Sequence, residues 1–191
     1  MVAGVVARLH GLDTRQRSIV VTRIKHMQLL RFPQASPAGR GHVTRFDLED
    51  LLKVVIAFQL IEIGMPSFRA VDLVGNRWTA CLGAAALAWR FSTHGGVPAP
   101  AITLRPRATA ALGVVKRDPQ QALERLHVGE PPPLAAVGGS GLVVLDLGEV
   151  LKRLAAAVPL SAADLESFMI DAGNRVFGSP SWSSWRKDAI A

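Results

Sequence analysis

The apolar residues among the first 30 positions recur at helical spacing. The segment Val2–Leu9 predicts a short helix that ends before Gly11. Asp13 or Thr14 can cap a second helix, because their side-chain oxygens accept the free N–H groups of a first turn. A strand over Ser18–Thr22 stays open as an alternative, since β-branched residues are frequent there. We expect a helix, with four apolar residues on or beside its buried face: Ile19, Val20, Ile24 and Met27.

The pattern changes after this helix. Proline at position 33 disfavours helical geometry in Phe32, so the second helix is expected to end before it. Polar and apolar residues alternate over His42–Phe46, which is typical of a half-buried strand. This strand would pair with Leu30–Phe32 across a loop rich in Pro and Gly. The sequence therefore predicts a helix followed by a small β-hairpin.

The segment Leu48–Ile63 predicts the next helix, which Asp47 can cap. Apolar residues cover most of its surface, so it must lie in the core or face a partner subunit. Gly64 is expected to end it, and Ser67 to about Phe91 reads as mostly helical.

The second half predicts a mixture of strands and helices beyond a linker at Ser92–Pro100. Strands are expected at Ala101–Leu104, Ala108–Val115, Leu134–Val137 and Leu142–Leu145. Helices are expected at Pro119–His127, at Gly148–Val158 after a cap at Asp146, and at Ala162–Ala172 after a cap at Ser161.

The distribution of charge suggests a partner. The chain carries 22 Lys and Arg residues against 15 Asp and Glu, a net charge of +7. Residues 1–45 hold eight of the basic residues and one acidic residue, Asp13, whereas the rest of the chain holds 14 of each sign. The whole excess therefore lies in the first quarter. Such an asymmetry indicates a polyanionic partner, and a solvated basic face is the alternative.

The basic helix and the basic hairpin together fit duplex DNA. A helix enters the major groove, and hairpin arginines reach phosphates or the neighbouring minor groove. The candidate DNA-binding residues in and before the helix are Thr14, Arg15, Gln16, Arg17, Ser18, Thr22, Arg23, Lys25 and His26. Those of the hairpin are Arg40, His42 and Arg45.

Four motifs occur in a fixed order over this region: Leu29-Leu30-Arg31-Phe32-Pro33, Gly39-Arg40-Gly41, Arg45-Phe46-Asp47-Leu48-Glu49-Asp50-Leu51 and Ile63-Gly64-Met65-Pro66-Ser67. From Val2 to about Val74 the chain resembles the winged helix-turn-helix of the MerR-like regulators. In that family a DNA-binding pair of helices is followed by a hydrophobic Leu-Leu-x-Pro segment and then by a loop with Gly and Arg. An aromatic residue next opens a helix with an acidic cap, and a turn leads into a fourth helix. One departure is that Arg45 directly precedes Phe46, whereas the family usually places one residue between its arginine and the aromatic residue. The family's effector-sensing cysteine cluster has no counterpart here, so metal sensing is not carried over.

Sequence motifs of catalysis are weak. Cys81 is the single cysteine, which excludes a Cys-cluster zinc site, and the five histidines are scattered without metal-ligand spacing. The run Gly138–Gly141 lacks the Lys-Ser/Thr of a phosphate loop and reads as a hairpin turn. We therefore expect no enzymatic activity, cofactor or metal. We also expect a soluble cytoplasmic protein without membrane contact, because no apolar run reaches the length of a spanning helix.

These observations predict an α+β protein. A mainly α winged helix-turn-helix domain with its following helices would occupy residues 1–91. A small α/β domain for dimerisation or for contact with a partner or effector would occupy 101–178, before a polar tail at 179–191. The expected function is sequence-specific binding of double-stranded DNA by a homodimeric transcriptional regulator, with possible contact to the transcription machinery. Two alternatives stay open: a non-specific architectural nucleic-acid binder, and a small ligand-binding or enzyme domain with an incidental basic face.

Overall fold

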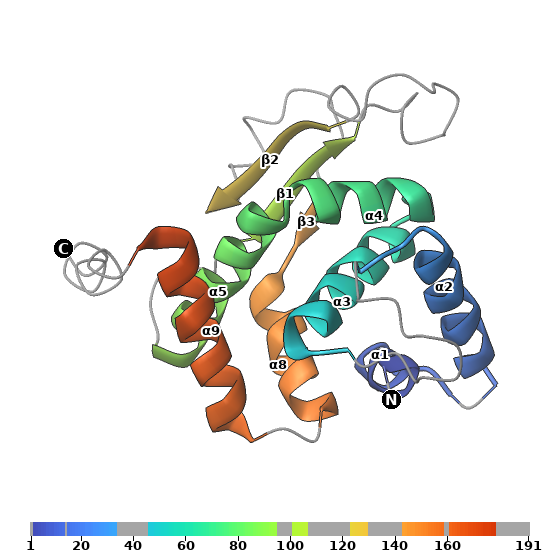
Figure 1. Cartoon of the computed structure of the whole chain (residues 1–191), viewed down its shortest axis with the longest axis horizontal. Helices are drawn as coiled ribbons and strands as arrows, with labels where there is room; N and C mark the ends of the chain where they lie inside the picture. Colours follow the sequence, from blue (N-terminus) through green and yellow to red (C-terminus); the bar gives the residue numbers. More distant parts are fainter. Residues whose placement is uncertain are drawn as a thin grey trace.

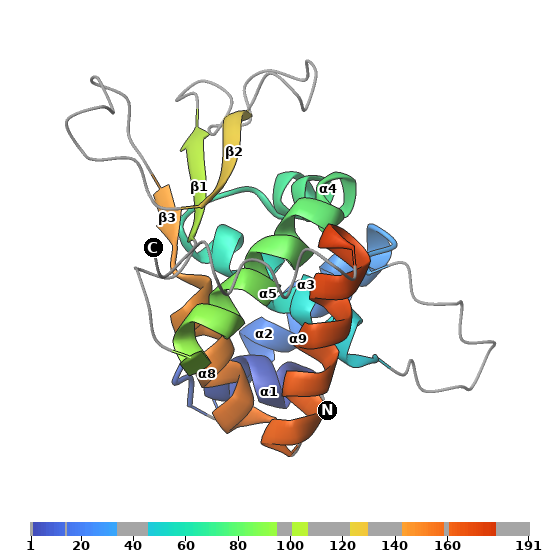
Figure 2. The same ribbon diagram turned by 90° about the vertical axis from the view of Figure 1, so that its left-hand side faces the viewer.

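The computed structural model describes residues 2–13, 15–33, 46–94, 101–106, 123–129, 143–158 and 161–178 (Figure 1). Helices make up most of these residues. They are α1 (Val2–Leu9), α2 (Arg17–Leu29), α3 (Leu48–Glu62), α4 (Ser67–Asn76), α5 (Trp78–His94), α8 (Leu147–Ala157) and α9 (Ala162–Phe177). The strands are β1 (Ala101–Pro106), β2 (Leu123–Gly129) and β3 (Val143–Leu145). They form a small antiparallel sheet in the order β2-β1-β3 at one end of the helical body (Figure 2).

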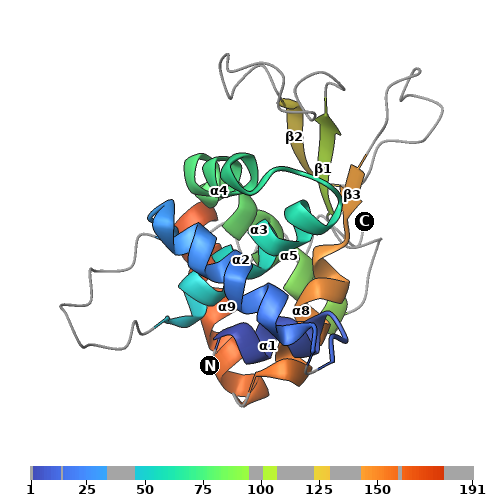
Figure 3. The same cartoon turned by 90° about the vertical axis from the view of Figure 1, so that its right-hand side faces the viewer.

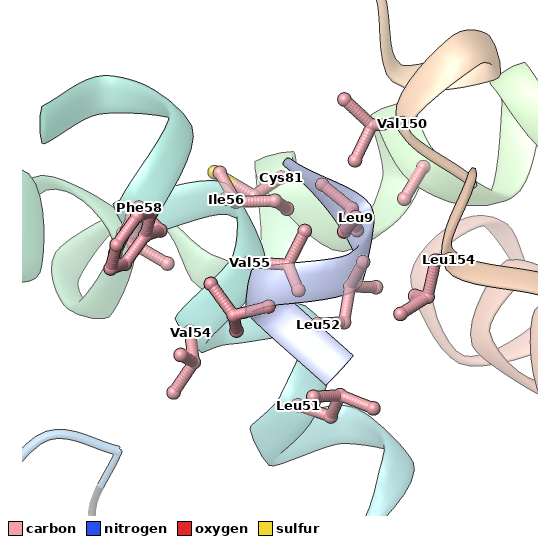
Figure 4. Close-up of a cluster of buried hydrophobic side chains, with 14 of the residues drawn as sticks. Leu9, Leu51, Leu52, Val54, Val55, Ile56, Phe58, Cys81, Val150 and Leu154 are labelled. Atoms are coloured by element: carbon pink, nitrogen blue, oxygen red, sulfur yellow. The ribbon is translucent and has the colours of Figure 1, made fainter. Parts of the chain in front are cut away.

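Helix α3 is the central element of the hydrophobic core. Every residue from Leu51 to Phe58 other than Lys53 is buried. Side chains from other helices belong to the same cluster, among them Leu9 of α1, Cys81 of α5 and Leu154 of α8 (Figure 4). The apolar surface that the sequence assigned to this helix is therefore covered within the chain. Burial of one large aliphatic side chain stabilises a fold by about 1.5–3 kcal/mol, so this helix contributes much of the driving force.

Helix α5 packs through small side chains. The eight consecutive residues Cys81–Ala88 are buried, and five of them are alanine or glycine. A Cβ added at Gly83 would lie 3.0 Å from Cγ1 of Val176 and 3.1 Å from Cζ of Phe177 on α9. The absence of a side chain at this position therefore allows α5 and α9 to approach closely.

Three helix caps predicted from the sequence are confirmed. Asp47 accepts a hydrogen bond from the backbone N–H of Asp50 at 2.7 Å, and Asp146 accepts one from Glu149 at 3.0 Å. Ser161 forms a reciprocal capping box with Asp164. Each cap satisfies N–H groups that a helix start leaves without a partner, so α3, α8 and α9 begin at these residues.

A polar network connects the start of α3 to α5 and α9. Oε1 of Glu49 accepts a hydrogen bond from Nε1 of Trp78 at 2.7 Å, and Oε2 lies 2.9 Å from Nη2 of Arg175. Lys53 lies 3.1 Å from Oε1 of the same carboxylate. Burial alone would raise the pKa of Glu49, but the hydrogen bonds from Arg175, Lys53 and Trp78 outweigh it and lower the pKa. The charged form of Glu49 thus joins three helices.

The expected α+β class with a separate C-terminal α/β domain is wrong. The described part of the chain is dominated by helices, and its β-structure is limited to three short strands. Helix α8 contacts α1 and α5, and α9 contacts α5. Buried residues from Val2 to Ala172 belong to one hydrophobic cluster. The C-terminal helices therefore complete the N-terminal core, because each has an apolar face that must be buried against another element.

The predicted strand Leu30–Phe32 is also wrong. Helix α2 ends there in a Schellman motif, in which Phe32 N–H donates to the carbonyl of Met27 at 3.0 Å and Arg31 N–H donates to Gln28 at 2.9 Å. Arg31 takes the left-handed conformation that this motif requires, with φ 57°. The chain thus turns and buries Phe32 instead of extending.

A second local prediction fails in the later half of the chain. The segment Leu123–His127, expected as the end of a helix, belongs to β2 and pairs with β1. Residues 42–45 of the expected hairpin strand His42–Phe46, the expected strands at 108–115 and 134–137 and the tail at 179–191 lie outside the described residues, and Phe46 belongs to no strand. None of the helices that the structure describes is long and apolar enough to cross a membrane.

The close contact of α5 with α9 gives a first prediction. Replacing Gly83 by valine should lower the free energy of unfolding by about 1–3 kcal/mol, because the added methyl groups would overpack the contact with Val176 and Phe177. Urea denaturation followed by circular dichroism measures the change. Gly75→Val on α4 is the matched control, since an added Cβ there meets no described atom within 4 Å. We expect it to change stability by less than about 0.5 kcal/mol. Equal losses in both variants would contradict the close approach of the two helices.

Candidate nucleic-acid interface

Helix α2 lies on the outer side of the molecule, where it contacts α1 and α4 (Figure 3). Val20, Ile24 and Met27 are buried and form its inner face. Their spacing of four and three residues keeps them on one side of a helix, so the opposite side is directed to solvent. The hydroxyl, amine and imidazole groups of α2 that face outward are therefore available to a partner.

Five exposed polar residues form what we call the outward face: Arg15 in the turn before α2, and Ser18, Thr22, Lys25 and His26 on the helix itself. The Thr22 hydroxyl donates to the carbonyl of Ser18 at 2.9 Å, and the Ser18 hydroxyl donates to Arg15 at 3.0 Å. Both hydroxyl oxygens still have lone pairs that can accept a further hydrogen bond. Neither Arg15 nor Lys25 forms an ion pair within the described ranges. Within the described part of the chain, the outward face thus presents cations and hydroxyl groups without a neutralising carboxylate.

The turn before α2 is held by a reciprocal pair of hydrogen bonds. Oδ1 of Asp13 accepts from the backbone N–H of Gln16 at 2.8 Å, and Oε1 of Gln16 accepts from the N–H of Asp13 at 3.2 Å. The sequence placed Gln16 among the DNA-contacting residues, but its side-chain oxygen is used in this cap. Arg17 lies against α1, since a Cβ added at Gly4 would come within 3.3 Å of Nη2 of Arg17. The Gln16 side chain is thus engaged in the turn and the Arg17 guanidinium lies near α1, although both residues are exposed.

Phe58 of α3 connects both N-terminal helices to the core. Cζ of Arg23 on α2 lies 5.5 Å from the centroid of the Phe58 ring, and the ring of His10 lies 5.1 Å from it, centroid to centroid. A guanidinium over an aromatic ring is attracted to the negative face of that ring. Arg23 is consequently half-buried, and the expectation that it lies on the exposed face with Lys25 needs correction. Its role in this geometry is to hold α2 against α3.

His10 is itself held by α3. Its side chain is 6% exposed, Nδ1 lies 2.6 Å from Oε2 of Glu62, and Nε2 lies 3.3 Å from the side-chain nitrogen of Gln59. In the neutral imidazole with a proton on Nδ1, that proton is donated to Glu62 while Nε2 accepts from Gln59. Burial lowers the pKa of His10 from its usual 6.5, although the Glu62 carboxylate opposes the change. The neutral form therefore fits its surroundings.

Arg8 connects α1 to the C-terminal end of α8. Its Nε and Nη2 donate to the carbonyl oxygen of Ala157 at 3.1 and 2.6 Å. This carbonyl belongs to the last turn of α8, where helix carbonyls have no partner within the helix and favour a cation. One of the eight basic residues in the first quarter of the chain thus has a structural role. Helices α1 and α2 are tied to the body at Arg8, His10 and Arg23.

The structure brings together part of the predicted set. Arg15, Ser18, Thr22, Lys25 and His26 share the outward face, whereas Gln16, Arg17 and Arg23 have the local contacts described above. The remaining candidates, Thr14, Arg40, His42 and Arg45, lie outside the described residues.

Sequence reasoning also misplaced an apolar residue of this surface. Ile19 was expected on the buried face, but its side chain is 53% exposed. The true inner stripe follows the i, i+4, i+7 spacing of Val20, Ile24 and Met27, which places Ile19 on the same side as Thr22 and His26. This spacing is visible in the sequence and could have predicted the exposed position of Ile19.

The described residues contain neither a metal-binding cluster nor a reactive thiol. The parts of the chain that the structure describes hold no group of three or more His, Cys, Asp or Glu side chains that could bind a metal ion. Burial raises the pKa of the Cys81 thiol to about 12, which makes it a poor nucleophile. No protein-family model matches the chain, and no curated protein or solved structure matches it significantly.

The burial of His10 predicts how stability depends on pH. Because its pKa is lower in the folded than in the unfolded protein, the unfolded chain binds more protons below the usual pKa of 6.5. The contribution of His10 should be complete above that pH and should be lost as the pH falls through the lowered value. Chemical denaturation at several pH values between about 7.5 and 5.5 measures this trend.

Two variants identify the residue responsible for this trend. His10→Gln should flatten the decline in stability over this range, because it removes the buried imidazole. His26→Gln removes an exposed imidazole from α2 and should keep the wild-type trend. A decline that persists unchanged in His10→Gln would show that another group causes it.

Proposed function

We propose that this protein is a sequence-specific regulator of transcription that binds double-stranded DNA by placing α2 in the major groove. The outward face of α2 is the observation that carries the proposal. The major groove of B-DNA admits one α-helix, and side chains like those of Arg15, Lys25 and Thr22 can bond to base edges or phosphates. The inner face of α2 is fixed to the core, so the groups that would meet DNA are presented by a rigid element.

The charge distribution supports a polyanionic partner. The net excess of +7 lies within residues 1–45, and the single acidic residue there, Asp13, accepts a hydrogen bond in the cap of α2. Neutralising phosphates with lysine and arginine releases condensed counterions, which favours binding. A basic surface that no acidic side chain compensates is suited to this type of association.

The order of elements supports the resemblance to the MerR-like regulators as part of the proposal. Helices α1 and α2 would form the two-helix reader, and α3 and α4 would be the helices that follow the wing in that family. Arg40, His42 and Arg45 lie in the sequence between α2 and α3, and they would contact the phosphates beside the groove. Thr14 would add a hydroxyl at the start of the reading helix.

The proposal includes a cytoplasmic homodimer with a possible contact to the transcription machinery. One helix covers few base pairs, and two symmetry-related helices that bind two half-sites would raise specificity. An architectural protein that binds DNA without sequence preference is the second candidate, which the same basic face favours. Sequencing of the bound fragments separates the two, because only a specific regulator would retain a shared motif.

A pull-down tests the function directly. Purified protein is mixed with sheared genomic DNA of its own source, and the retained fragments are sequenced. The double variant Arg15→Ala with Lys25→Ala should lose the motif, and the log–log salt slope of its binding should be shallower by up to about 1.8. Arg23 is left unchanged, because its contact with Phe58 makes it structural.

The control is a double variant that loses the same number of positive charges on a different helix, α8. Lys152→Ala with Arg153→Ala removes two exposed cations from α8 and should leave both the motif and the salt slope unchanged. Equal losses in the two double variants would mean that total charge governs binding, which would contradict a reading role for α2. Retention of diffuse fragments by the wild type would favour the architectural candidate.

A further inference from the structure

Two large apolar side chains are exposed on the outer side of α2. Ile19 in the first turns is 53% exposed and Leu29 in the last turn is 81% exposed. Single exposed apolar residues are common on protein surfaces, so exposure by itself assigns no role. The two residues lie at opposite ends of the helix, and this difference carries the inference.

Ile19 is surrounded by the polar groups of the outward face. Residues three, four and seven positions apart are neighbours on a helix, so Thr22 and His26 lie beside Ile19 on one side and Arg15 on the other. These neighbours are exposed as well. Leu29 is the last residue of α2, next to the Schellman turn, and the same rule places Lys25 and His26 beside it. Ile19 differs from Leu29 in lying at the N-terminal end of the helix, among the polar groups of the first turns.

We propose that Ile19 contacts the C5-methyl group of thymine in the major groove and so selects thymine within the recognised site. This inference rests on the proposed function and names one component of its specificity. Thymine is distinguished in the major groove by its O4 acceptor and this methyl group, and apolar side chains recognise the latter. The positive charges of Arg15 and Lys25 attract the flanking phosphates and would hold the isoleucine over the bases.

The position of Ile19 along the helix agrees with this contact. In helix-turn-helix proteins the N-terminal residues of the recognition helix approach the base edges, and Ile19 is the third residue of α2. Contact with a methyl group removes apolar surface of both partners from water. One methyl group contributes about fourfold in affinity, from the transfer free energy of a methylene-sized group. Two half-sites in a dimer would each contribute such a factor.

The experiment removes the methyl group without changing base pairing. DNA fragments retained in the pull-down are amplified with either dTTP or dUTP, and the affinity of the wild type for the two pools is compared at one salt concentration. We expect the uracil pool to bind about fourfold more weakly for each thymine that Ile19 contacts. In Ile19→Ala the two pools should bind equally, while the salt slope stays that of the wild type. Leu29→Ala is the matched control and should keep the wild-type preference for thymine.

Each other outcome has a definite meaning. Equal binding of both pools by the wild type, or a thymine preference that survives in Ile19→Ala, would overturn the inference while leaving DNA binding intact. A third pool, amplified with 5-methyl-dCTP, tests the other source of a C5-methyl group. A gain in wild-type affinity for that pool without a thymine preference would overturn the assignment to thymine. Failure to retain DNA at all would overturn the proposed function, and this inference with it.

Discussion

The burial of α3 on nearly every side is the constraint on which the rest of the structure depends. Apolar side chains at consecutive positions, such as Leu52, Val54 and Val55, point in different directions around a helix and cannot be covered by a single neighbour. Side chains of α1, α5 and α8 therefore join α3 in one cluster. This requirement draws helices from both ends of the chain into the same core. The small residues of α5 then allow α9 to pack closely on its far side.

The same constraint determines how α2 is presented. Helix α2 buries only a narrow stripe and adds the contact of Arg23 with Phe58, so most of its polar surface stays in solvent. His10 packs on the same Phe58 ring and bonds to Glu62, which fixes α1 relative to α3. A reading helix gains specificity when its side chains are held in place before the partner arrives, because less conformational freedom is lost on binding. The aromatic contacts behind α2 serve that purpose in the proposed function.

Charged side chains are paired with opposite charges in one part of the molecule and are exposed to solvent in another. Around Glu49 opposite charges are paired, and Arg175, Lys53 and Trp78 hold the start of α3 to α9 and α5. On α2 the exposed cations face solvent without such partners in the described parts of the chain. Paired charges stabilise a fold locally, whereas uncompensated charges create a field that acts on a distant polyanion. The cations of the outward face of α2 are uncompensated charges of this type.

The sequence by itself determined the elements whose signals are local. The caps at Asp47, Asp146 and Ser161 bond to residues three positions away, so the starts of α3, α8 and α9 could be predicted without knowing the fold. The first helix, Val2–Leu9, and the basic character of α2 were found in the same way.

Tertiary structure decided what depends on distant partners. Leu123–His127 is a strand because β1 pairs with it, and α8 and α9 join the N-terminal core because their apolar faces need a cover. At the interface, the half-buried position of Arg23 followed from how α2 rests on Phe58. Periodicity gives the direction of one side chain relative to the next along a helix. Only the neighbouring elements decide which of those directions points inward.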